Sequence, residues 1–365
     1  MDSTNKSLLI HTLFALCSCC AATTFAAYDP VTAGGFGGNE KTGRFVYDGR
    51  KLPLHFGKLD ILRDAETKIC LLQNYDVTVR VVNKRANDPI VQFPCADVNP
   101  DYHFYWDGNL ETKNGAYSPA NDAIAFGVIV NSMYKDWYNT PALIENSNDM
   151  VTQKNIVLRI HDWGGSIAYW DGSAVTFDDG DLELYFPPVS LGVTAHEISH
   201  GFTEQHSHLV YQYQSGALNE SFSDMASKAA EFYVYGKIID WKLGAEFLRA
   251  DRAFRYMDNP RRDCVDQGSP KICSIDNAKD YSPTLNVHLT SGVFNKLFYL
   301  LATSPGWDAR KAFDIMVQAN ESYWTAMTSF QDAACGVMDA AKDYGYNTDV
   351  IVKAFVKVGI NVDQC

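Results

Sequence analysis

The chain has 365 residues, of which 46% are hydrophobic, and this length is enough for one large or two smaller packed domains. Its formal net charge is −13, which makes it a poor candidate for binding nucleic acids or anionic membranes. No apolar run in the interior of the sequence is long enough to span a bilayer.

The first 26 residues are typical of an export signal. Lys6 is the only basic residue there, an apolar stretch runs from Leu8 to Cys17, and residues 24–26 form a plausible cleavage site. We therefore expect a signal peptide over residues 1–26 and a secreted, extracellular protein. Lipid attachment at Cys19 is the alternative, because residues 16–19 are a tolerable lipoprotein box.

The pattern from about residue 45 to residue 184 is typical of β-strands. Residues 75–82 alternate with a period of two, which indicates a half-buried strand, and residues 156–160 are a short run rich in β-formers. Turn-forming clusters of Gly, Asn and Asp separate such runs, as at 106–109 and 178–181. One helix is expected in this region, from Ala120 to Tyr138.

From about Ser190 the pattern changes to that of helices. They are expected over residues 191–205, 215–235, 287–302, 308–320, 330–344 and 349–358. Gly345 and Gly359 stand where the last two helices should stop. We therefore expect an α+β protein with a β-rich N-terminal domain over 27–211 and a helical C-terminal domain over 212–365. The helix 191–205 would lie at the floor of the cleft between them, a usual place for a substrate site.

The run HEISH, residues 196–200, lies on this helix. Residues four apart share a helix face, so His196 and His200 can bind one metal ion, and Glu197 can accept a proton from metal-bound water. Glu220 would complete a His2Glu set for Zn²⁺ and leave the fourth position to water. Asp224, one helical turn later, can fix the tautomer of a ligand histidine. The alternative, a solvated helix with two incidental histidines, leaves the acidic pair at helical spacing unexplained.

The cysteines agree with export. Three of the nine lie within residues 17–20 and six lie in the rest of the chain. An even number in an oxidising compartment predicts three disulfides, and the spacing alone does not choose their pairing.

Three segments resemble a known family. The run AHEISHGFTEQHSHLVYQYQSGALNESFSDM, residues 195–225, resembles the core of the thermolysin-like zinc endopeptidases. GGNEKTGRFVYDG near the N-terminus and SGVFNKLFYLLATSPGWDARKAF, residues 291–313, resemble the secreted bacterial elastase branch. The resemblance covers about residues 34–365. It implies a monomeric zinc endopeptidase with one catalytic Zn²⁺ and polypeptide substrates.

The resemblance also implies roles for individual residues. Tyr211 and His288 stand at the positions of the oxyanion-stabilising tyrosine and histidine, and Arg255 matches the arginine that holds a substrate carbonyl. Peptides would be cut on the amino side of apolar residues, because the pocket for the residue after the cleaved bond is apolar. The positions matching this pocket are Tyr185, Pro188, Val193 and Phe254, and Ala168 is a further substrate-binding position.

Two disulfides follow from the same resemblance. It favours Cys70–Cys95 and Cys335–Cys365, which match the two bridges of the elastase branch. Cys264 and Cys273 remain as an extra pair.

The chain departs from the family at several positions. Ile167 replaces an asparagine that binds the peptide main chain, and Asn286 replaces an aspartate that orients the catalytic histidine. Gly192 and Lys228 replace two acidic ligands of a calcium site. Its remaining carboxylates are Glu231 and Asp240, so we expect at most weak Ca²⁺ binding.

These departures keep a second function open, a catalytically weakened protease-like zinc protein that acts as a binding module. A third possibility, a purely structural disulfide-rich exported protein, leaves the zinc residues unexplained. Only a few residues separate the expected signal from Gly34, where the family carries a long pro-segment, so the chain is expected to fold unaided or with help from another molecule.

Overall fold

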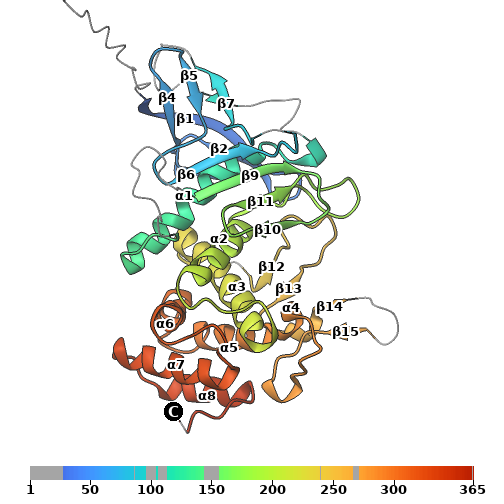
Figure 1. Ribbon diagram of the computed structural model, residues 1–365, viewed down its shortest axis with the longest axis vertical. Coiled ribbons are helices and arrows are strands. Elements are labelled where there is room, and N and C mark those ends of the chain that lie inside the picture. The colour runs from blue at the N-terminus through green and yellow to red at the C-terminus, as the bar shows by residue number, and fades with distance from the viewer. Residues whose placement is uncertain are drawn as a thin grey trace, which may run out of the picture.

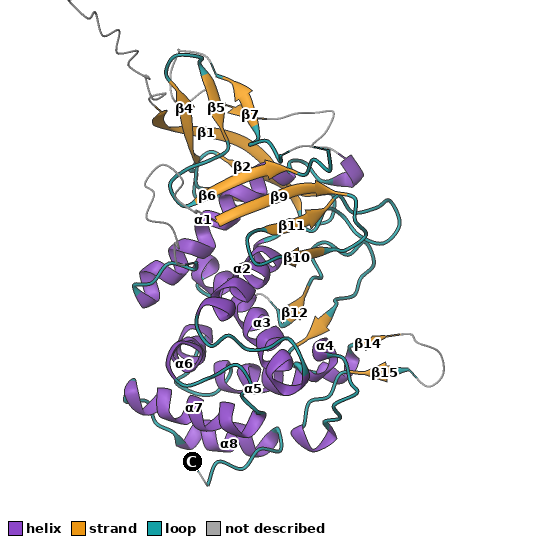
Figure 2. Ribbon diagram, viewed as in Figure 1, coloured by secondary structure: helices purple, strands orange, loops and turns teal. Residues whose placement is uncertain are grey.

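The computed structural model describes residues 28–85, 87–95, 104–105, 113–143, 156–238, 240–265, 271–363 and 365. The expected signal peptide, the lipoprotein box and the turn at 106–109 lie outside these residues. The strand-rich N-terminal half and the helical C-terminal half confirm the α+β expectation (Figures 1 and 2). None of the helices in the described ranges has the length and apolarity needed to cross a membrane.

A seven-stranded sheet forms the far end of the N-terminal half, in the order β3-β2-β1-β4-β5-β7, with β8 also paired to β1. The sequence pattern placed the first strand near residue 45, and this was wrong, because β1 begins at Tyr28. This strand is rich in glycine, which has low intrinsic β-propensity, and it is held by pairing with β4, β2 and β8. The strands are β1 (Tyr28–Asn39), β2 (Gly43–Tyr47), β3 (His55–Phe56), β4 (Leu59–Asp64), β5 (Ile69–Leu71), β7 (Gln92–Pro94) and β8 (Phe104–Tyr105).

A second sheet, of four strands, lies next to the helices in the order β10-β11-β9-β6. Two of its strands, β6 and β9, confirm the strands expected at 75–82 and 156–160. The strands are β6 (Val77–Val81), β9 (Ile156–Asp162), β10 (Ala168–Trp170) and β11 (Val175–Asp178). Among the described strands β10 pairs only with β11, so it is one of the two edges of this sheet.

Three long helices connect the two halves: α1 (Pro119–Tyr138), α2 (Leu191–Gln205) and α3 (Tyr213–Tyr235). The bounds expected for α2 are confirmed. Ser190 caps the start of this helix, because the Ser190 side chain accepts a hydrogen bond from the backbone N–H of Val193. Two small ribbons follow α3, formed by β12 (Lys242–Leu243) with β13 (Arg255–Tyr256) and by β14 (Cys264–Val265) with β15 (Ile272–Cys273).

The remaining helices are α4 (Val287–Thr290), α5 (Gly292–Ala302), α6 (Ala309–Ser322), α7 (Phe330–Asp343) and α8 (Asp349–Lys357). The single helix expected over 287–302 is wrong, because the chain breaks at Ser291 into α4 and α5. Gly292 packs so close to the carbonyl of Ile275 that a Cβ atom there would lie 2.3 Å from its oxygen. Gly345 and Gly359 have φ of 64° and 79°, in agreement with the expected helix stops.

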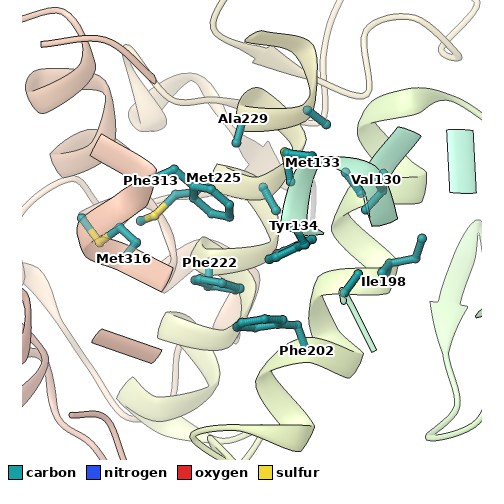
Figure 3. Close-up of a cluster of buried hydrophobic side chains, with 14 of the residues drawn as sticks. Val130, Met133, Tyr134, Ile198, Phe202, Phe222, Met225, Ala229, Phe313 and Met316 are labelled. Carbon is teal, nitrogen blue, oxygen red and sulfur yellow. The ribbon is translucent and has the colours of Figure 1, made fainter. Parts of the chain in front are cut away.

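The core beneath the HEISH helix is a series of stacked aromatic rings (Figure 3). The ring of Tyr134 on α1 stacks on Phe202 of α2 at 4.7 Å between centroids. Phe202 stacks on Phe222 of α3 at 5.6 Å, and Phe222 on Phe313 of α6 at 5.4 Å. The four rings are fully buried. The helices that carry the candidate metal ligands are therefore held in place by one shared core.

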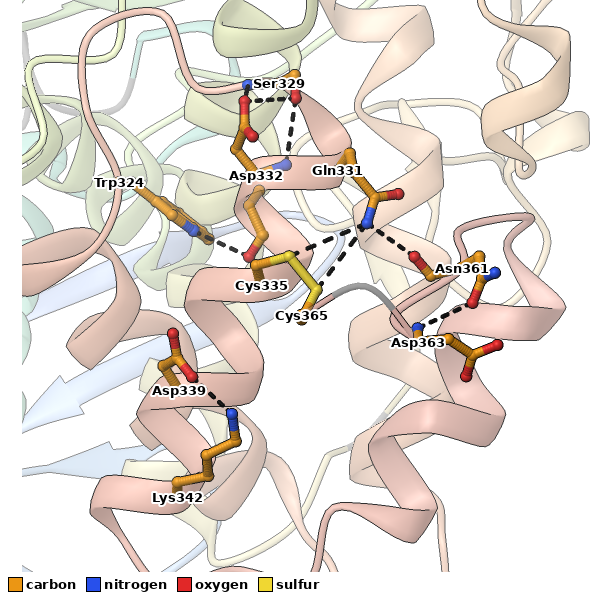
Figure 4. The surroundings of a disulfide bond; sticks show 11 residues. Trp324, Ser329, Gln331, Asp332, Cys335, Asp339, Lys342, Asn361, Asp363 and Cys365 are labelled. Atoms are coloured by element: carbon orange, nitrogen blue, oxygen red, sulfur yellow. Dashed lines mark hydrogen bonds and ion pairs between the residues drawn. A yellow bond between two sulfur atoms is a disulfide. The ribbon is translucent and has the colours of Figure 1, made fainter.

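All three expected disulfides are present, Cys70–Cys95, Cys264–Cys273 and Cys335–Cys365. The third joins α7 to residue 365, and the side-chain amide of Gln331 beside it donates to the carbonyl of Asn361 at 2.7 Å (Figure 4).

Candidate metal centre

Three side chains from α2 and α3 converge on one point. His196, His200 and Glu220 each offer a ligand atom, and these atoms all lie within 4.8 Å of one another. The two Nε2 atoms are 3.0 Å apart, and the Glu220 oxygens lie 3.6 Å and 3.5 Å from them. Glu220 is fully buried, and its Oε2 atom has no hydrogen-bond partner. A buried carboxylate that lies beside two imidazoles and has one oxygen without a hydrogen bond fits Zn²⁺ in a His2Glu set with one position left open.

Each candidate histidine ligand is oriented through its other ring nitrogen. His196 Nδ1 lies 2.9 Å from Asp224 Oδ1, as the spacing of Asp224 on the helix predicted. His200 Nδ1 lies 2.6 Å from Asn219 Oδ1. Sequence reasoning missed this role of Asn219. The only indication in the sequence is that Asn219 directly precedes Glu220. The contact itself depends on how α2 and α3 pack against each other. With Nδ1 engaged on both rings, the Nε2 atoms are free to bind a metal.

Arg255 makes two hydrogen bonds to Asp224, each of 2.6 Å. Asn295 donates a further one to the same carboxylate at 2.8 Å. Arg255 also lies 3.7 Å from Glu220 and lines the adjacent groove. The resemblance assigns the Arg255 guanidinium to a substrate carbonyl. The same group is hydrogen-bonded to Asp224, the carboxylate that orients His196.

The charges around the centre hold its carboxylates ionised. Burial acts to raise the pKa of Glu220, but His196 and His200 outweigh it and lower the pKa to about 2. Burial likewise opposes ionisation of Asp224, and Arg255 with His196 brings its pKa well below the usual range. Glu220 is therefore a carboxylate at neutral pH, as a metal ligand must be.

Tyr211 and His288 lie together beside Glu220. The Tyr211 hydroxyl donates to Glu220 Oε1 and lies 3.3 Å from His288 Nε2. Burial and the charge of Glu220 raise the pKa of Tyr211 far above its ordinary value, so the phenol remains a donor. His288 Nδ1 lies 2.7 Å from Asn286 Oδ1, and burial lowers the pKa of His288.

A groove of about 1310 Å³ lies beside the centre, and of the three candidate ligands His196 is on its wall. Glu197 lines it beside His196 and is 8% exposed. Other sequence-predicted residues on its wall are Ile167, Ala168, Val193, Phe254, Arg255, Asn286 and His288.

Two residues expected in the apolar pocket are not on this wall. Within the described part of the chain, Tyr185 and Pro188 are absent from the groove lining. Tyr185 instead packs against Phe247, with ring centroids 6.4 Å apart, and its hydroxyl donates to Asp178 at 3.4 Å. The loop that carries it curls over Asp181, whose carboxylate accepts the backbone N–H of Tyr185.

The positions compared with a calcium site hold an ammonium group instead. Lys228 is 5% exposed, and its Nζ lies 2.7 Å from Glu231 and 3.6 Å from Asp240. Gly192 offers only its carbonyl, which accepts from Ser227 Oγ at 2.6 Å. Among the residues that the structure describes, the His2Glu set is the one group of three or more His, Cys, Asp or Glu side chains that lie close enough to share a metal ion.

Comparison with known proteins agrees with this geometry. The family model described as thermolysin metallopeptidase, catalytic domain, matches residues 52–204, and the alpha-helical domain of the same family matches 207–360. A zinc metalloproteinase of Legionella pneumophila is 45% identical over 344 residues, which are 91% of this chain and 60% of that protein. A neutral protease of Vibrio proteolyticus is 43% identical over 330 residues, 90% of this chain and 49% of that protein.

A solved structure shows the same fold. It is the precursor of protealysin, a metalloproteinase from Serratia proteamaculans, with a TM-score of 0.62 and 22% sequence identity. The match covers 78% of this chain and 87% of that one. By contrast, this chain spans only 60% and 49% of the length of the Legionella and Vibrio relatives.

Proposed function

Since the chain belongs to the thermolysin family of zinc metallopeptidases, we propose that it is a secreted endopeptidase that cuts peptide bonds on the amino side of apolar residues. One observation carries the proposal: the His2Glu set, whose carboxylate is fully buried, has Glu197 beside it on the wall of an open groove. We further propose a monomer with the domain division given above, at residues 27–211 and 212–365.

Zn²⁺ bound by His196, His200 and Glu220 would act as a Lewis acid and lower the pKa of a bound water. Glu197 would accept the proton of the attacking water and pass it to the leaving amine. Tyr211 would donate a hydrogen bond to the oxyanion of the tetrahedral intermediate.

His288 would contribute to oxyanion stabilisation only in part of its titration range. Its Nδ1–H points at Asn286 Oδ1, so a neutral imidazole presents an unprotonated Nε2. Only the imidazolium form donates from Nε2, and the uncharged Asn286 does not stabilise that charge. Tyr211 is therefore the more constant donor of the two.

Hydrolysis of casein by the purified full chain, with and without a zinc chelator, tests the proposal. Glu197→Gln should keep zinc and fold but lose about 10²- to 10⁴-fold in rate, because the general base is gone. Glu204→Gln on the same helix is the matched control, since Gln still accepts from Trp170 Nε1. Cleavage at the parent rate by Glu197→Gln would contradict the mechanism.

The fragments from the same digestion test the specificity. Val193 and Phe254 give the groove wall an apolar and aromatic surface beside the candidate centre. The new N-termini of the casein fragments should therefore be mostly large apolar residues. A spread of N-terminal residues that matches the composition of casein would contradict the proposed preference.

The second candidate is a zinc-bound, catalytically weakened protein that binds polypeptides. Ile167 in the groove, which cannot hydrogen-bond to a peptide, and Asn286 beside His288 favour it. Both candidates bind zinc and unfolded protein, and only the endopeptidase releases fragments. Tight casein binding without turnover by the zinc-loaded chain would select the second.

A further inference from the structure

Lys41, in the turn between β1 and β2, reaches across to the segment that follows β12. Its Nζ donates to the backbone carbonyls of Ala245 at 2.8 Å, Leu248 at 2.7 Å and Ala250 at 3.0 Å. An ammonium group has three N–H donors, and a single loop satisfies all of them here. An exposed lysine usually holds a mobile, solvated charge, so this arrangement orders both the side chain and the loop.

The same turn holds the loop at a second point. Asn39 Nδ2 donates to the carbonyl of Glu246 at 3.1 Å. The carboxylate of Glu246 in turn accepts from Ser190 Oγ at 2.6 Å. Because Ser190 caps α2, the loop is connected to the start of the helix that carries His196.

The loop supports the apolar wall of the groove. Phe247 within it stacks on Phe254, with centroids 5.3 Å apart, and Phe254 is the residue directly before Arg255. Gly244, with φ of +76°, lets the chain turn there, and a Cβ atom would lie 2.7 Å from the Phe254 ring. Lys41, Phe247 and Phe254 all line the same groove.

We propose that Lys41 is a positioning residue for substrate binding. Its ammonium holds residues 244–250 in one conformation, and the Phe247–Phe254 stack then fixes the apolar pocket next to the metal centre. The pocket's role rests on the proposed endopeptidase function, whereas the ordering of the loop does not.

Lys41→Met tests the proposal, because it keeps the length of the side chain and removes all three donors. Lys51→Met, at an exposed lysine between β2 and β3, is the matched control for the lost charge. Hydrogen–deuterium exchange at the amides of residues 244–254 should rise about tenfold in Lys41→Met and stay unchanged in Lys51→Met. For a peptide with an apolar residue after the cleaved bond, KM should rise roughly fivefold with kcat nearly unchanged.

Lys41→Arg provides a second variant. Its planar fork keeps the charge but cannot place one nitrogen among three carbonyls, so both readouts should fall between those of the parent and Lys41→Met. Unchanged exchange in a folded Lys41→Met would overturn the proposal. Raised hydrogen–deuterium exchange in Lys41→Met with an unchanged KM would overturn the role of Lys41 in substrate binding. Raised exchange with equal losses in kcat and kcat/KM would overturn it as well. If no variant cleaves peptides, the endopeptidase function fails, and the exchange measurement still decides whether Lys41 orders the loop.

Discussion

Nδ1 of His196 and Oδ1 of Asp224 lie 2.9 Å apart, in a contact that joins α2 to α3. Asp224 is 1% exposed and also accepts both hydrogen bonds from Arg255. One carboxylate thus orients a candidate zinc ligand and holds an arginine on the groove wall. A change at Asp224 should therefore affect both the zinc affinity of the site and the position of the arginine expected to contact substrate.

We expect Asp224→Asn to weaken zinc binding by about 10- to 100-fold, because the amide cannot match the charge of the carboxylate that supports the ligand histidine. Competition against a chromophoric chelator measures this directly. Asp339→Asn, at a partly exposed residue of α7 paired with Lys342, is the control. Equal zinc affinity in the parent and Asp224→Asn would show that Asp224 does not support the ligand.

Ile167→Asn should improve substrate binding. Ile167 lines the groove beside the edge strand β10, and an amide there can bond to an extended peptide. One added hydrogen bond is worth about 0.5–1.5 kcal/mol, which corresponds to a roughly 2- to 12-fold fall in KM. Steady-state kinetics test this. Ile167→Leu, which adds no polar group, should leave KM near the parent value, and an equal effect of both substitutions would contradict the explanation.

Asp263 should make stability depend on pH. Burial raises its pKa from 3.8 to about 8, with Arg255 opposing the shift, so the folded protein keeps a proton that the unfolded chain releases between these values. The free energy of unfolding should therefore fall as pH rises through this range, by at most about 1.4 kcal/mol per unit from this group.

Asp263→Asn removes this contribution and keeps the acceptor for the backbone N–H of Tyr256. Urea unfolding at pH 5 and pH 8 should show a smaller loss of stability with rising pH in the variant than in the parent. Identical losses would show that Asp263 is already ionised at pH 5.

The melting temperature should change little between calcium-free buffer and millimolar calcium. The ammonium of Lys228 already lies between Glu231 and Asp240, and a cation entering there would meet like charge. A parent protein that melts many degrees lower in a calcium-specific chelator would contradict this prediction.

Gly192→Asp combined with Lys228→Glu should create calcium dependence. A Cβ atom at Gly192 would lie 3.2 Å from Glu246 Oε1, so a carboxylate there would join an acidic side chain already present. Gly192→Asn with Lys228→Gln has similar shapes without the charges and should show no gain in melting temperature with calcium.

Much of the fold and of the centre was predictable because the signals are local. The bounds of α2 follow from its cap and its apolar spacing, and the converging ligands follow from the HEISH run and Glu220. Contacts that depend on how distant elements pack were not predictable. Asn219 contacts His200 only because α2 and α3 pack side by side. Lys41 donates to backbone carbonyls that lie more than two hundred residues further along the chain.

Two further details also depend on contacts between distant segments. The expected helix over 287–302 divides at Ser291, next to Gly292, and no helical periodicity reveals the close approach of Gly292 to the carbonyl of Ile275. Tyr185 was assigned to the pocket from its motif position, and its contact with Phe247 depends on the loop around Asp181, which the sequence pattern does not reveal.

The stacked rings of Tyr134, Phe202, Phe222 and Phe313 run from α1 through α2 and α3 to α6. The strand-rich and helical halves share this core, so we expect them to lose their packing together. A chain nicked once between α2 and α3, within residues 206–212, would therefore remain a non-covalent complex of two fragments. Calorimetry of that complex would show one melting transition for both fragments.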